Sequence, residues 1–187
     1  YMDTQVESIY TNGTDLVFST RVKDGYLIYA GKRKYGPYSY DTLGELMTSQ
    51  DGTTIMYHAT RNDRHYISVG GMVTGPYDDM GCLMTGPDGK TAVFSEYTGG
   101  KWHRHIGDRT YGPYDQVGCV ESGNTYGRLL YSARTGDEWS IYHEERVIHR
   151  TTGADSVIES LALSPDGNTT AFVIDTGSPD GGCYVHA

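Results

Sequence analysis

The chain has little of several features that define large classes of protein. Its 187 residues include only three cysteines and six prolines. Three cysteines cannot build the disulfide framework of a small secreted domain, and no Cys-x-x-Cys or His-x-x-x-His spacing indicates a zinc site. No apolar stretch approaches the ~20 residues of a membrane-spanning helix, so we expect no insertion into a membrane.

Excess positive charge and helical periodicity are also missing. The formal net charge is −9 with acidic residues scattered along the chain, which disfavours nucleic-acid binding through a basic face. No window of useful length carries apolar side chains at the i, i+3, i+4, i+7 spacing of an amphipathic helix. Short apolar or alternating runs, as at 16–19 and 55–58, are typical of strands. With 25 glycines and 17 tyrosines, the chain is predicted to be all-β with many turns.

What the chain does have is a repeat. Gly-Pro-Tyr occurs at 36–38, 75–77 and 112–114. Asx-Gly turns, which favour hairpins with positive φ at both central residues, recur at 51–52, 88–89 and 166–167. A second turn follows about ten residues later in the first four units, at 23–25, 61–63, 98–100 and 135–137, so each unit is expected to hold about four short strands. Four strands at a period near 40 residues describe a propeller blade.

Two series of residues each recur five times along the chain, which predicts five units. Acidic residues precede the first strand of each unit, and aromatic residues open the third strand. The acidic series is Asp3, Asp41, Asp78, Asp115 and Asp155, and the aromatic series is Tyr26, Tyr66, Trp102, Trp139 and Tyr184. The last unit stops after its third strand, which leaves the N-terminal residues to supply the fourth.

The fold prediction is therefore an all-β, five-bladed β-propeller with four antiparallel strands per blade. It forms a single domain over 1–187, and the N-terminal strand closes the last blade. The blades are predicted at about 7–43, 44–80, 81–117, 118–157, and 158–187 together with 1–6. An open-ended fragment is the alternative.

One segment indicates a family. Residues 161–173, Leu-Ala-Leu-Ser-Pro-Asp-Gly-Asn-Thr-Thr-Ala-Phe-Val, resemble the Ser-Pro-Asp-Gly-Lys-x-x-Ala-Phe core of TolB-type, WD-like propeller repeats. Residues 86–95 repeat the pattern with Gly for Ser, while the recurrent Gly-Pro-Tyr-Asp ending departs from it. The resemblance is to the repeat and not to TolB itself. It implies a rigid platform for proteins or small ligands, often one module of a larger envelope or secreted protein, and no activity by itself.

The best candidate ligand residues are the two repeated series. Five aromatic rings near polar loops would suit stacking against sugars, with carboxylates accepting hydroxyl protons. The candidates are Tyr26, Tyr66, Trp102, Trp139, Tyr184, Asp41, Asp78, Asp115 and Asp155. The structural alternatives are rings that fill the gaps between sheets and carboxylates that bond to backbone amides and fix turns.

Other reactive side chains point to structural roles. His103 and His105 would share one face of a strand, but no carboxylate or cysteine is tied to them by sequence, so we expect no metal. Cys82 and Cys119 occupy equivalent positions and are expected to be small buried residues, with a disulfide between them as the alternative. No cofactor is expected.

The predicted function is a non-catalytic binding module that recognises a protein partner through its loop face, as a monomeric domain of a larger protein. The first alternative is a lectin-like propeller with repeated glycan sites between blades. The second is a glycosidase, in which Glu7, Glu45, Glu121 or Glu159 would supply the paired carboxylates that such chemistry needs. Short loops and the absence of nucleophile or phosphate-binding motifs favour the non-enzymatic prediction.

Overall fold

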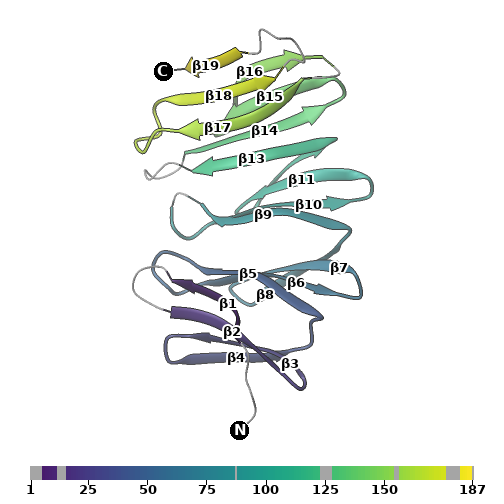
Figure 1. The fold of residues 1–187 in the computed structure, drawn as a ribbon, viewed down its shortest axis with the longest axis vertical. Coiled ribbons are helices and arrows are strands. Elements are labelled where there is room, and N and C mark those ends of the chain that lie inside the picture. Colours follow the sequence, from purple (N-terminus) through teal and green to yellow (C-terminus); the bar gives the residue numbers. More distant parts are fainter. Residues whose placement is uncertain are drawn as a thin grey trace. The chain divides into compact units, whose positions relative to one another are not determined.

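The computed structural model describes residues 6–11, 16–86, 88–122, 128–153, 156–175 and 182–186, with side chains for all of these except 119, 122 and 182–186. The described residues form nineteen strands and no helix, and so none that could cross a membrane. The strands pair as five antiparallel sheets, each built from consecutive strands (Figure 1). The all-β prediction is confirmed.

Each sheet follows the chain order from one edge to the other. The first sheet contains β1 (Val6–Thr11), β2 (Leu16–Val22), β3 (Gly25–Ala30) and β4 (Arg33–Tyr38). The second contains β5 (Thr42–Thr48), β6 (Ile55–Arg61), β7 (Arg64–Val69) and β8 (Met72–Tyr77). The third contains β9 (Asp79–Thr85), β10 (Ala92–Thr98), β11 (Lys101–Ile106) and β12 (Arg109–Tyr114).

The last two sheets continue the pattern. The fourth contains β13 (Gln116–Ser122), β14 (Leu129–Thr135), β15 (Glu138–His143) and β16 (Arg146–Thr152). The fifth contains three strands, β17 (Val157–Leu163), β18 (Thr170–Asp175) and β19 (Gly182–His186). Residues 1–5, which were predicted to help complete the fifth sheet, lie outside the described residues.

The chain divides into two compact units, and each has its own core. The first unit comprises residues 1–85 and 89–96, and the second comprises 86–88 and 97–187. In the first unit, one cluster around Val17, Ile28 and Tyr57 joins the first two sheets, and a second surrounds Met56 and Ile67. In the second unit, the core cluster includes Leu130, Ile141, Leu161, Phe172 and Ile174.

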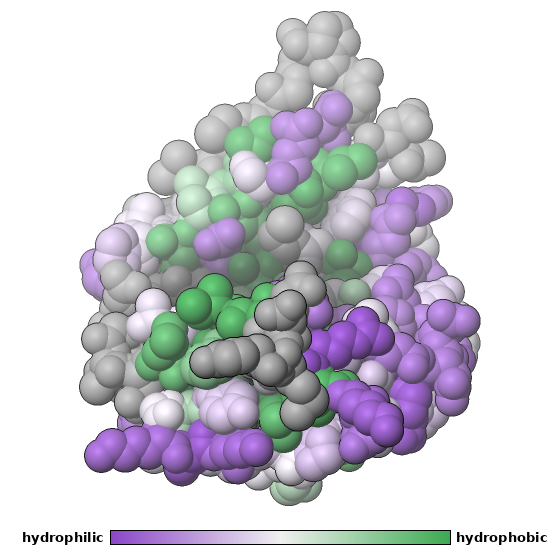
Figure 2. Space-filling view, turned by 60° about the horizontal axis from the view of Figure 1, so that its bottom comes forward, coloured by the Kyte–Doolittle hydropathy of each residue, from purple (hydrophilic) through white to green (hydrophobic). Residues whose placement is uncertain are grey.

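Burial along the strands explains why each sheet forms. β3 alternates, with Tyr26, Ile28 and Ala30 buried, as expected where one face of a strand packs on a core. β14 buries five consecutive residues, because both of its faces are covered. The fourth strand of the second sheet, β8, is exposed along most of its length. Figure 2 shows hydrophilic side chains around smaller apolar patches on the surface that includes the first sheet.

The Gly-Pro-Tyr motifs end the fourth strands of the first three sheets. Each Gly-Pro peptide is cis, and the glycines have φ of +100°, +115° and +122°. The register with the third strand shifts at this position in each sheet, which marks a β-bulge. Glycine is required there because a methyl group on Gly75 would lie 2.6 Å from the His65 carbonyl oxygen.

The Asx-Gly turns are confirmed, with one difference in geometry. Gly52, Gly89 and Gly167 adopt nearly identical φ values of +68°, +67° and +69°. Positive φ at two consecutive residues occurs instead in other turns, at Asn62 and Asp63, at Gly70 and Gly71, and at Gly99 and Gly100. Asp51 has no positive φ, and its carboxylate caps the turn by accepting from the Thr53 amide and the Ser49 hydroxyl.

Candidate functional site

Two of the predicted carboxylates accept a hydrogen bond from a backbone amide in a turn of their own sheet, a contact that we call a clasp. Asp41 directly precedes β5, and its Oδ2 accepts a hydrogen bond of 2.6 Å from the Asn62 amide. Asp115 directly precedes β13, and its Oδ2 accepts one of 2.7 Å from the Gly136 amide. In both sheets the clasp ties the start of the first strand to the turn between the second and third strands. These contacts match the turn-fixing role considered for the series.

Ion pairs engage two members of the acidic series. Lys101 donates to Asp115, and this hydrogen bond, with that from the Gly136 amide, lowers the pKa of Asp115. Arg64 forms an ion pair with Asp78, which directly precedes β9. Asp155 lies outside the described residues. The described carboxylates of the series thus already have protein partners.

Strand register separates the aromatic series into different positions. Tyr26 pairs with Tyr38, and Trp102 pairs with Tyr114, but the residue opposite Tyr77 is His65. Tyr66 follows His65, so it lies on the opposite face of its strand, because successive residues alternate between faces. Tyr184 on β19 pairs with Phe172 on β18, and the side chain of Tyr184 is not among those described.

The burial of the aromatic rings also differs. Tyr26 is 3% exposed and Trp139 is 6% exposed, so neither ring has a free face for a ligand. The Tyr26 hydroxyl donates to the Asp41 carbonyl at 3.2 Å, which links the first sheet to the start of the second. Tyr66 and Trp102 are half-buried, with Tyr66 against Tyr40 and Trp102 against Tyr97. The rings that are most buried fill space between elements, as large aromatic residues commonly do.

An open groove of about 360 Å³ lies where loops of the first two sheets meet. Its charged lining comes from two hairpin turns and the connection between the sheets, and includes Arg21, Lys23, Asp24, Asp41 and Arg61. The Arg21 guanidinium lies 5.7 Å from the Tyr26 ring centre, and that of Arg61 lies 5.3 Å from the Tyr66 ring centre. These cation–π contacts restrain both arginines at the groove. The groove is where members of both predicted series approach each other.

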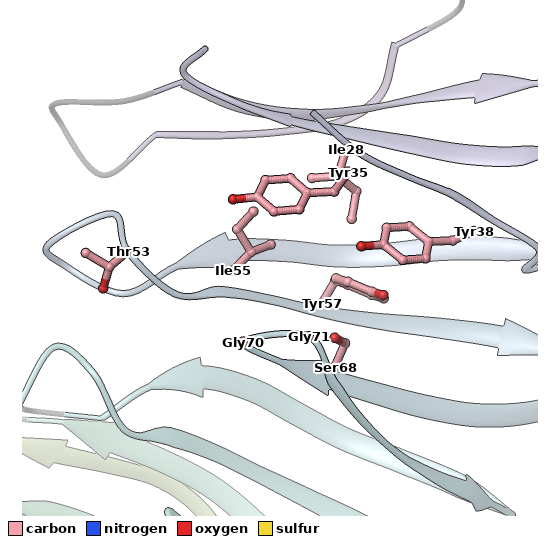
Figure 3. A pocket seen from close by; sticks show the side chains of 9 residues that line it. All are labelled: Ile28, Tyr35, Tyr38, Thr53, Ile55, Tyr57, Ser68, Gly70 and Gly71. Carbon is pink, nitrogen blue, oxygen red and sulfur yellow. The ribbon is translucent and has the colours of Figure 1, made fainter. Parts of the chain in front are cut away.

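A second, smaller cavity of about 120 Å³ lies between the first and second sheets. Figure 3 shows Tyr35 and Tyr38 of β4 on one side and Ile55, Tyr57 and Ser68 of the second sheet on the other. Its complete lining is Ile28, Tyr35, Tyr38, Thr53, Ile55, Tyr57, Ser68, Gly70 and Gly71. Thr53, Gly70 and Gly71 are exposed, so the cavity reaches solvent at that end. We call this space the tyrosine cavity.

The environment of the tyrosine cavity disfavours ionised side chains. Burial raises the pKa of Tyr57, and it also raises the pKa of Tyr38 with the help of the nearby Tyr40 and Tyr35. Both phenols are therefore neutral at physiological pH. Ser68 is 1% exposed, and its hydroxyl partly offsets the rise in the pKa of Tyr57 without forming a hydrogen bond of ordinary geometry. The cavity thus combines aromatic faces with neutral hydroxyl groups.

The sequence prediction did not select the tyrosine cavity. Tyr38, which ends the first Gly-Pro-Tyr motif, packs against Tyr57 of the second sheet, with ring centres 5.6 Å apart. Tyr114 is likewise buried, and its ring contacts Tyr142. Tyr38 and Tyr114, two of the three motif tyrosines, therefore pack against the next sheet along the chain. The signal in the sequence was the repeated motif itself, which was used only to establish the repeat.

The remaining candidates occupy separate places. The side chain of Cys82 on β9 is exposed, so the expectation that it is buried is wrong, and Cys119 is described only by its backbone. His103 and His105 lie on β11, and the described residues contain no group of three or more potential metal ligands. Glu7, Glu45, Glu121 and Glu159 lie exposed on first strands, where the Glu45 carboxylate accepts from the Leu83 amide at 3.1 Å.

Comparisons with known proteins find likeness in structure only. No protein-family model and no curated protein matches the chain. A solved structure of dihydro-heme d1 dehydrogenase NirN in complex with DHE has a TM-score of 0.55 and 14% identity, over 98% of this chain and 45% of that one. A structure from a study of two prolyl endopeptidases has a TM-score of 0.56 and 12% identity, over 97% of this chain and 34% of that one.

Both of these proteins contain β-propeller domains. The present chain spans less than half the length of either one. At such low identity the likeness concerns the fold and not the activity. The sheets and these comparisons together support a β-propeller fold for the chain.

Proposed function

We propose that the chain is a binding module without catalytic machinery, which recognises a protein partner through the groove at the loops of the first two sheets. The observation that carries this proposal is the pair of arginines, Arg21 and Arg61, held over tyrosine rings at an open groove of about 360 Å³. Arginine is enriched at protein interfaces, and restraint before binding reduces the entropy that association costs.

The charges of the groove suggest the partner's chemistry. Arg21, Lys23 and Arg61 supply three cations, against the two carboxylates of Asp24 and Asp41. The Asp41 carboxylate already accepts from the Asn62 amide. A segment with carboxylates is the best complement, because arginine binds a carboxylate through two parallel hydrogen bonds. The proposed partner therefore presents an acidic loop or peptide.

Selection from a displayed random peptide library tests this proposal. We expect acidic peptides to be enriched on the wild-type chain and lost on an Arg21→Glu, Arg61→Glu double variant. Arg150→Glu is the matched control, because Arg150 on β16 is exposed and lies outside the groove. Enrichment that is independent of Arg21 and Arg61, or no enrichment on a folded wild-type chain, would contradict the proposal.

The lectin-like alternative has one observation in its favour, which is that the tyrosine cavity lies between neighbouring sheets. Binding on a glycan array that is lost on Tyr38→Ala would support it. We also propose that the five sheets are the blades of a ring that residues 1–5 close, in a repeat related to the TolB type. A spin label at Asp3 that broadens the amide signals of Gly182–His186 would support closure.

A further inference from the structure

The two compact units contain a similar side-chain arrangement, with two positions changed. In the second sheet Tyr57 pairs across the strands with Ser68, and in the fourth sheet Tyr131 pairs with Tyr142. The Tyr142 ring is stacked on Tyr131, with ring centres 4.8 Å apart and planes within 8°. Ser68 has no ring to place there. The position that a tyrosine ring fills in the second unit belongs to the tyrosine cavity in the first.

The neighbouring sheet repeats the arrangement as well. Tyr38 and Tyr114 both end a Gly-Pro-Tyr motif and hold the same register position in their sheets. Tyr114 contacts the Tyr142 ring at 6.3 Å between centres. Tyr38 lines the tyrosine cavity. Both tyrosines that surround the Tyr142 ring therefore have counterparts around the cavity.

A second substitution enlarges the difference. Ile28 pairs with Tyr35 in the first sheet, and Arg104 pairs with Tyr111 in the third. Arg104 is fully buried, lies 5.1 Å from the Tyr131 ring centre and donates to the Gly118 carbonyl at 2.9 Å. Ile28, the counterpart of Arg104, lines the cavity. The space that corresponds to the Arg104 guanidinium is therefore part of the cavity.

We propose that the tyrosine cavity is a binding site for a single phenol ring, which occupies the place that Tyr142 takes in the second unit. The volume of about 120 Å³ suits one ring, since an apolar protein cavity of about 150 Å³ takes up benzene. The ring stacks on Tyr57 and contacts Tyr38, as Tyr142 does with Tyr131 and Tyr114. This proposal does not depend on the loop groove.

The hydroxyl groups that line the cavity are expected to favour a phenol over benzene as the ligand. The Ser68 hydroxyl is buried and lacks a hydrogen bond of ordinary geometry, so it offers a partner for a ligand hydroxyl. The Tyr38 hydroxyl lies on the lining of the same cavity. A charged ligand is disfavoured, because burial there penalises the ionised state of the tyrosines.

The same ring chemistry has two sources, a free small phenol or the tyrosine side chain of a partner. Exposed Thr53, Gly70 and Gly71 at the rim give either one a route from solvent. Two probes distinguish the sources. The first is p-cresol, and the second is a capped Gly-Tyr-Gly peptide, which needs room for its backbone at the rim.

NMR titration of the 15N-labelled chain with p-cresol tests the proposal. We expect saturable shifts of the Thr53, Gly70 and Gly71 amides, with a dissociation constant on the order of 1 mM. Ser68→Tyr places a ring where the second unit has one and should weaken p-cresol binding at least tenfold. Ser68→Ala is the matched control, which keeps the cavity open and reduces only the preference for p-cresol over toluene.

The outcomes are distinct. If both p-cresol and the peptide bind, the ligand is a partner's tyrosine, and if only p-cresol binds, it is a free phenol. Either result supports a phenol site, whatever happens at the loop groove. The proposal is overturned if p-cresol binds folded Ser68→Tyr as well as it binds the wild type. It is also overturned if the wild-type shifts lie away from the rim, or if methyl glucoside binds and p-cresol does not.

Discussion

At the residue scale, the Asx-Gly turns show how side chains fix the backbone. Asp166 Oδ1 accepts from the Ser164 hydroxyl at 2.6 Å and from the Asn168 amide at 3.1 Å. The Thr169 amide donates to the Ser164 hydroxyl at 2.9 Å. The turn at Ser49, Asp51 and Thr54 repeats this pattern. Such bonds replace the ladder contacts that a turn cannot make.

This turn makes stability depend on pH. Its hydrogen bonds, that from the Ser164 hydroxyl first, lower the pKa of Asp166 from 3.8 to about 2. Because the folded pKa is below the unfolded one, the stabilisation is present above pH 3.8 and is lost as the pH falls toward 2. Urea unfolding between pH 5 and pH 2 should show wild type losing its advantage over Asp166→Asn. A stability difference that is constant over this range would contradict the account.

The position of these turns could be predicted from the sequence, because Asp-Gly between apolar runs is a strong local signal. The capping role of Asp51 and Asp166 could not be inferred from the dipeptide alone. It depends on a serine two residues earlier, whose hydroxyl reaches a backbone amide only when the loop has closed. The acidic series was likewise visible, but its clasps join residues that lie 21 apart.

At the scale of the strand, Gly-Pro-Tyr sets where the fourth strand bends. Gly75 has φ of +115° and faces the His65 carbonyl closely, so we expect Gly75→Ala to cost about 2–3 kcal/mol of unfolding free energy. Gly99→Ala is the control, with φ of +59° and no atom within 4 Å of an added methyl group, and should cost about 1 kcal/mol. Equal losses for the two variants in urea unfolding would show that the close approach is unimportant.

Strand register explains the part of the site prediction that differs from the structure. The four-strand pattern could be predicted from the turn residues and from the alternation of apolar and polar side chains. This pattern indicated approximately where each third strand begins. It could not fix register, because a shift of one residue preserves the turns and reverses the faces. The residue equivalent to Tyr26 in the second sheet is therefore His65, and Tyr66 lies on the other face.

At the scale of the molecule, a repeat produces similar spaces between successive sheets, and function depends on which of them stay open. The propeller fold was predictable because the period near 40 residues is visible in one dimension. The tyrosine cavity was not predictable, because it depends on two positions that lack the larger side chain of their counterparts. These positions are Ser68, opposite Tyr57, and Ile28, opposite Tyr35. Neither residue is unusual until it is compared with its counterpart, Arg104 in the third sheet or Tyr142 in the fourth.

The central claim is that the two units share one ring site, open in the first and occupied by Tyr142 in the second. Tyr142→Ser should remove the occupant, lower the unfolding free energy by about 2 kcal/mol or more, and open a second cavity. The most direct measurement is the number of p-cresol molecules bound per chain at saturation, by calorimetry or NMR. The account predicts one for the wild type and two for Tyr142→Ser. A folded Tyr142→Ser chain that still binds one, or a wild type that binds none, would contradict it.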